Sequence, residues 1–169
     1  MSINTSSSNK PLTSERNNSA DAEAAFKSSL DEFERALLHP LISGELSTWV
    51  QDIQHDWSEA ASHIHYQLKH QHPRQYEEIA QQDPELLSRI DLLKAEDAAI
   101  EEHREKISQA VARVAEHVPK LEPDEAKAEK HTKPLVDDGM AFVARVRKQV
   151  VAVQTWYIEA FNRDRGAGD

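Results

Sequence analysis

The chain has 169 residues, with 30 acidic and 20 basic side chains, so its formal net charge is −10. This balance argues against nucleic acid and against an anionic membrane surface as partners, because both attract clustered Lys and Arg. The absence of cysteine excludes disulfides, thiolate nucleophiles and cysteine-ligated zinc or iron–sulfur sites.

The composition favours a single all-α domain. Helix-forming residues dominate, only four glycines occur, and no segment alternates apolar and polar residues as a half-buried strand would. No apolar run reaches membrane-spanning length, and residues 1–20 lack the hydrophobic segment of a secretory signal. We therefore expect a cytoplasmic protein.

Residues 1–18 are rich in Ser, Asn and Thr and contain almost nothing apolar, which predicts a disordered tail ahead of a bundle domain over 19–169. The first helix is expected to begin near Ser19 or Asp21, since either residue can cap it. It should end at His39-Pro40, because the residue before a proline disfavours the α conformation. Its apolar face repeats with steps of four and three: Phe26, Leu30, Phe33 and Leu37.

The second helix is expected from about Leu46 to His70, with the pair His72-Pro73 ending it. Residues 73–83 are predicted to form a connector with room for a short helical turn around Tyr76. The apolar face of this helix comprises Leu46, Val50, Ile53, Trp57, Ile64 and Leu68.

The third helix is predicted to start at Asp83-Pro84-Glu85, which supplies an N-cap, a proline at the first helical position and an acid near the positive end of the helix dipole. It should end before Pro119. The charged segment 120–133 is expected to be a solvated connector, in part helical. A fourth helix then runs from about Thr132 to the glycines at 166 and 168. Four amphipathic helices in this order predict an up-down-up-down bundle.

Three polar residues occupy positions on the apolar faces: Asp97 and Arg104 on the third helix and Gln149 on the fourth. A charge on a buried face is costly unless it is paired or binds a metal. Asp97 and Arg104 are two turns apart, roughly 10 Å along the axis, so a partner on another helix is at least as suitable for Asp97. Gln149 and His65 are the leading candidates, and pairing with Arg104 or metal ligation are the alternatives.

Nine histidines raise the possibility of a metal site. His65 lies beside the apolar face of the second helix, and His70 and His72 lie at its end, where an imidazolium suits the helix dipole. The Glu-x-x-His pattern of carboxylate metal sites in bundles does not occur in the sequence. Structural or surface roles are therefore expected for these histidines.

Three stretches resemble segments of a bacterial branch of the hemerythrin-like, four-helix cation-binding domains. They are residues 36–44 (ALLHPLISG), 92–100 (LLKAEDAAI) and 159–166 (EAFNRDRG). With the helix layout, the resemblance spans about residues 22–169. It implies a non-haem di-iron site lined by histidines and carboxylates, used for oxygen binding, iron handling or oxidative sensing.

Carried over residue by residue, the resemblance matches His65 to a family histidine and places His70 where an acid is usual. It places Asp97 and Gln149 where family members carry histidines. The loss of two imidazoles predicts a degenerate, non-catalytic member that needs no cofactor. The alternative is an iron-binding protein with a substituted site built from His65 and Asp97, with His70, Glu101 and Gln149 as weaker ligands.

A third interpretation is a regulatory bundle that binds a protein partner through the tail or through the acidic segment 122–129. The sequence contains no glycine-rich phosphate loop, nucleophile elbow or nucleophile–base pair. It therefore carries no recognisable signature of an enzyme, and binding functions are favoured over catalysis.

Overall fold

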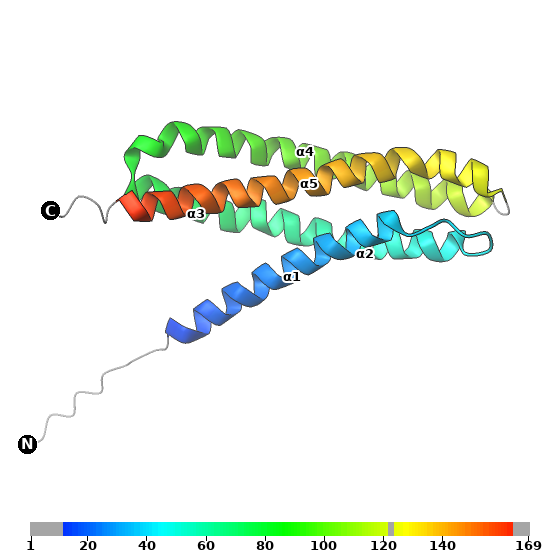
Figure 1. The fold of residues 1–169 in the computed structure, drawn as a ribbon, viewed down its shortest axis with the longest axis horizontal. Coiled ribbons are helices and arrows are strands. Elements are labelled where there is room, and N and C mark those ends of the chain that lie inside the picture. Colours follow the sequence, from blue (N-terminus) through cyan, green and yellow to red (C-terminus); the bar gives the residue numbers. More distant parts are fainter. Residues whose placement is uncertain (1–11, 122–123, 164–169) are drawn as a thin grey trace, which may run out of the picture.

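A computed structural model describes residues 12–121 and 124–163, with side chains from residue 21 onward. Every regular element in these residues is helical (Figure 1), which confirms the all-α prediction. A π-helical turn at Gln67–Gln71 and 3-10 turns at Pro84–Leu86 and Val118–Leu121 join the longer helices. The α-helices are α1 (Leu12–Leu38), α2 (Leu46–Tyr66), α3 (His72–Gln82), α4 (Leu87–His117) and α5 (Glu125–Arg163).

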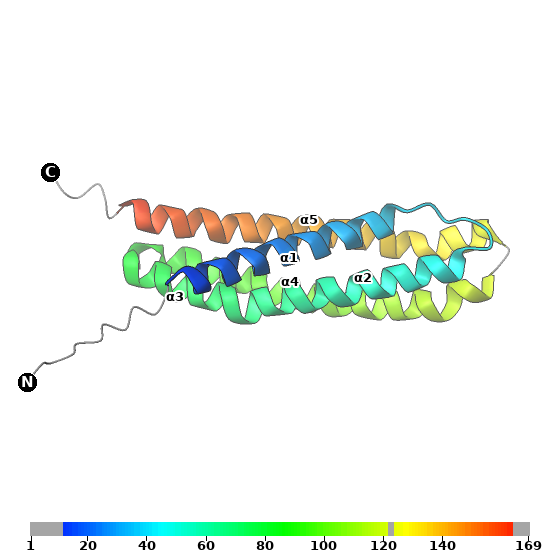
Figure 2. The ribbon, with the colours of Figure 1, turned by 90° about the horizontal axis from the view of Figure 1, so that it is seen from below.

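The long helices lie side by side along one axis (Figure 1, Figure 2). Both α1 and α4 pack against α2 and α5, and α3 packs against α5. The α1–α2 and α4–α5 connections lie at one end of the bundle, and the α3–α4 connection lies at the other. Toward its N-terminal end α1 diverges from the other helices. No helix in the described part of the chain is long and apolar enough to cross a membrane.

Two apolar cores follow one another along the bundle. The larger core draws on α1, α2, α4 and α5, and includes Phe33, Trp57 and Phe142, whose rings contact each other at centroid distances of 4.9 and 5.6 Å. The smaller core lies at the end that carries the α3–α4 connection, and none of its described residues comes from α1. It consists of Tyr76, Ile79, Leu86, Ile90, Leu93, Val153 and Ala160.

The pair His72-Pro73 does not end the helical path, contrary to the prediction. The backbone N–H of His72 bonds to the carbonyl of Gln67, five residues back, and closes a π turn immediately before the proline. In a regular α-helix the proline ring would clash with the carbonyl four residues earlier, and the wider turn relieves this clash. Pro73 then lies in the first turn of α3, where its missing N–H costs little. Residues 73–83, predicted as a connector, therefore belong mostly to α3.

The starts of the first and last helices also differ from the prediction. α1 begins at Leu12, so residues 12–18 of the predicted tail are helical, because each residue added to an existing helix gains one hydrogen bond. The remainder of the predicted tail lies outside the described residues. α5 begins at Glu125 rather than near Thr132. The Oδ1 atom of Asp124 accepts the N–H of Lys127 at 3.1 Å and caps the helix.

The predicted connector 120–133 thus contains the first turns of α5. Ala128 and Thr132 are buried there and extend the apolar face to Leu135. Neither residue is apolar enough to have marked a helix in the sequence. The prediction for the start of the third helix holds in part: Asp83 Oδ1 accepts the N–H of Glu85 at 3.0 Å and caps the 3-10 turn Pro84–Leu86, and α4 itself begins at Leu87. The predicted end of the fourth helix, at the glycines, lies outside the described residues.

Gly139 lies where α5 meets α1. A Cβ atom at this position would come within 2.7 Å of Leu37 Cδ1. Gly139→Leu should therefore lower the free energy of unfolding by about 1–3 kcal/mol through overpacking, as measured by urea denaturation. Ala144→Leu, at an exposed position of α5, is the matched control and should change it by less than about 0.5 kcal/mol. Equal stability of the two variants would contradict the close contact between α1 and α5.

Candidate functional site

Four buried side chains that carry polar groups lie where the two apolar cores meet: His72 and Tyr76 of α3, Asp97 of α4 and Gln149 of α5, of which Tyr76 also belongs to the smaller core. We refer to them as the polar cluster. Their exposed fractions are 1%, 3%, 8% and 5%, respectively. On α4 the cluster interrupts the apolar face between Leu93, in the smaller core, and Ile100, in the larger one. The cluster thus forms a polar layer that joins α3, α4 and α5.

The carboxylate of Asp97 is the centre of this layer. His72 Nδ1 lies 2.9 and 3.0 Å from its two oxygens. The hydroxyl of Tyr76 donates to Oδ2 at 2.6 Å, and Gln149 Nε2 donates to Oδ1 at 2.7 Å. Because a buried carboxylate is costly unless its oxygens accept hydrogen bonds, these three donors offset the loss of hydration.

Two further observations show which atoms of Tyr76 and Gln149 act as hydrogen-bond donors. Burial and the hydrogen bond to Asp97 raise the pKa of Tyr76 well above its usual range, which keeps its hydroxyl a donor. Gln149 Nε2 also donates to the backbone carbonyl of Leu93 at 2.9 Å. Since both of these neighbours are acceptors, the amide nitrogen and not the amide oxygen faces them.

The imidazole of His72 has one nitrogen engaged and one free. Nδ1 faces the carboxylate and carries a proton, whereas Nε2 is buried without a hydrogen-bond partner in the described residues. The ring borders a narrow void, lined mainly by apolar side chains such as Phe26 and Ile64, that has no room for a water molecule. A histidine held by an aspartate resembles a general base, but a substrate has no space beside this ring. The arrangement suits a structural role.

Arg104 and His65 take part in a different network, which corrects the predicted buried set. Arg104 Nε and Nη2 donate to the two carboxylate oxygens of Glu101, each at 3.0 Å. His65 Nδ1 lies 3.1 Å from Glu101 Oε1. The side chain of Arg104 is 20% exposed and that of His65 is 50% exposed, so both lie near the surface. The hydrogen bond from Arg104 lowers the pKa of Glu101.

The candidate metal ligands therefore do not meet at one point. Asp97 meets Gln149, His65 meets Glu101, and the exposed ring of His70 lies against Tyr66 at a centroid distance of 5.1 Å. Within residues 12–121 and 124–163, no group of three or more His, Cys, Asp or Glu side chains is placed to hold a metal ion.

His72 is the member of the polar cluster that the sequence interpretation placed at a helix end. A signal for its burial existed, because it lies four residues after Leu68 and four before Tyr76 on one helical face. The adjacent proline outweighed that periodicity, since prolines normally end helices.

Protein-family models, curated proteins and solved structures give no match to this chain.

Asp97→Ala should lower the free energy of unfolding by about 3–5 kcal/mol, because three buried donors would lose their common acceptor. Chemical denaturation measures the effect. Asp91→Ala removes an exposed carboxylate from the same helix and should change stability by less than about 0.5 kcal/mol. Similar losses in the two variants would argue against the polar cluster as a stabilising element.

Tyr76 predicts a specific alkaline destabilisation. Its pKa is raised in the folded state, so above about pH 10 the folded protein keeps a proton that the unfolded chain has lost. The stability that Tyr76 contributes is thus complete below about pH 10 and is lost as the pH rises further. In Tyr76→Phe the decline of unfolding free energy above pH 10 should be shallower by up to about 1.4 kcal/mol per pH unit.

The matched control is Tyr66→Phe, which removes an exposed phenol. Denaturation midpoints recorded across the alkaline range give the slopes. Identical slopes for wild type and Tyr76→Phe would rule out a buried, hydrogen-bonded hydroxyl at position 76.

Proposed function

We propose that this chain is a cytoplasmic, non-enzymatic, hemerythrin-like binding protein with an up-down-up-down four-helix bundle. In this proposal a hydrogen-bonded polar cluster stands in place of a metal site. One observation carries it: Asp97 and Gln149, which the sequence resemblance matches to histidines of the family, are bonded to each other at 2.7 Å.

The chemistry of the polar cluster supports a metal-free bundle. Gln149 directs its amide nitrogen, a donor, at Asp97, and a donor cannot ligate a cation. His72 directs a protonated nitrogen at the same carboxylate, and Tyr76 adds its hydroxyl. A cation bound to Asp97 would have to displace these donors and leave them buried without partners, which costs about 1–3 kcal/mol for each.

Binding rather than catalysis is favoured by the absence of open space at the polar cluster. The void beside His72 is too small for a water molecule, so the Asp97–His72 pair has no access to a substrate. The cluster instead joins α3, α4 and α5 through side-chain hydrogen bonds. In this proposal the bundle acts as a rigid support for a binding surface elsewhere on the molecule.

The iron-binding alternative is less well supported. It requires His65 and Asp97 to act on one metal, but they belong to separate networks. His65 bonds to Glu101, which is held by Arg104. The side chain of His65 is half exposed, whereas Asp97 is buried.

Metal analysis and chelation test the proposal. Protein purified without chelator should contain far less than one iron per chain, and EDTA should leave its free energy of unfolding unchanged. Asp97→Ala should lose the same stability with and without EDTA, because hydrogen bonds and not metal coordination are removed. Stoichiometric iron that disappears in Asp97→Ala or in His65→Ala would restore the iron-binding alternative. The iron-binding alternative would also be restored if EDTA lowered the free energy of unfolding of the wild type but not that of Asp97→Ala.

A further inference from the structure

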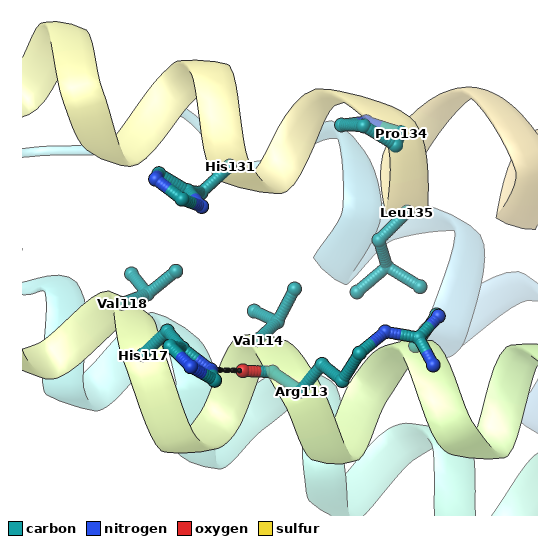
Figure 3. A pocket seen from close by; sticks show the side chains of 8 residues that line it. Arg113, Val114, His117, Val118, His131, Pro134 and Leu135 are labelled. Carbon is teal, nitrogen blue, oxygen red and sulfur yellow. Dashed lines mark hydrogen bonds between the residues drawn. The ribbon is translucent and has the colours of Figure 1, made fainter.

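A second feature lies away from the polar cluster, between the last turns of α4 and the first turns of α5. There the two helices border an open hollow of about 310 Å³ (Figure 3). Its volume falls within the range of small-molecule binding sites. It is lined by Ala110, Arg113, Val114, His117, Val118, His131, Pro134 and Leu135.

The floor and the rim of this hollow differ in chemistry. Val114, Val118 and Leu135 are buried and form an apolar floor. The exposed side chains of Arg113, His117 and His131 stand around it, from both helices. Figure 3 shows His131 of α5 opposite His117 of α4, with the valines between them. The pocket therefore combines an apolar base with basic groups at its edge.

Among the described residues, no carboxylate forms an ion pair with the basic groups at the rim. The pocket lining contains no Asp or Glu, although the chain has 30 acidic residues against 20 basic ones. Arg104, Arg145 and Arg147 each form ion pairs, whereas Arg113 has no such partner among the described residues. This unpaired guanidinium can form a charge-assisted hydrogen bond with an anion.

The rim is also partly preorganised. His117 Nδ1 donates to the backbone carbonyl of Arg113 at 2.8 Å, one turn earlier on α4. This bond restrains the exposed ring at the edge of the pocket. Less side-chain entropy is then lost when a ligand binds.

We propose that this pocket binds a small organic anion with an apolar tail, such as a medium-chain carboxylate. The tail lies on Val114, Val118 and Leu135, and the carboxylate contacts Arg113, whose guanidinium lies at the end of the hollow that carries Leu135 (Figure 3). The proposal goes beyond the metal-free function above and can fail separately from it, since it uses other residues and another measurement.

Isothermal titration of the full chain with octanoate tests it. Octanoate should bind saturably, with one molecule per chain, and uncharged octanol should bind about tenfold more weakly because it lacks the anion. Arg113→Gln should weaken octanoate binding about twofold to fivefold, the size expected for an exposed charge pair. Lys94→Gln removes an exposed cation from α4 away from the pocket and is the matched control.

A second variant tests the apolar floor. Ala110→Leu places a larger side chain in the hollow and should abolish octanoate binding. Because leucine is a good helix former, the circular dichroism signal of the helices should be retained. The proposal is overturned if octanoate fails to bind the wild type, or if octanol binds as tightly as octanoate. It is also overturned if Arg113→Gln or folded Ala110→Leu binds octanoate like the wild type. EDTA has no bearing on these outcomes, so they are independent of the metal test.

Discussion

The buried carboxylate of Asp97 constrains how the helices can be placed. A desolvated anion is tolerated only where donors reach it, and here they come from α3 and α5. Hydrogen bonds tolerate only small errors of distance and angle, whereas apolar contacts are non-directional. A slide of α3 or α5 along α4 would preserve much apolar contact but break the bonds to Asp97. The polar cluster therefore specifies a register that the two cores alone leave loosely defined.

This arrangement depends on the backbone ahead of α3. The π turn at Gln67–Gln71 accommodates one more residue than an α-helical turn. Without it, the residues that follow would be rotated by roughly 100° about the helix axis. His72 and Tyr76 would then point away from Asp97. Pro73 and the π turn are thus coupled to the polar cluster, although neither contributes a side chain to it.

The extent of what the sequence predicts follows from the kind of signal each residue carries. Long apolar periodicities predicted the all-α class, the course of α2 and α4 and the unusual positions of Asp97 and Gln149. Small residues such as Ala128 carry too little hydropathy to mark the start of α5. Arg104 shares the periodic position of a buried residue, but its length lets the guanidinium reach Glu101 near the surface. Periodicity describes a Cα position, whereas the burial of a long side chain depends on where its end lies.

The division of the interior into two cores has a consequence for local opening. The smaller core is built from α3, α4 and α5 in the described residues, whereas α1 contributes only to the larger core. Detachment of α1 would therefore expose the larger core but leave the smaller one closed by its own contacts. Backbone amides exchange with solvent through such partial openings as well as through global unfolding. Amides of α3 should then exchange more slowly than those of the N-terminal half of α1, with the layer around Asp97 marking the boundary between the two regimes.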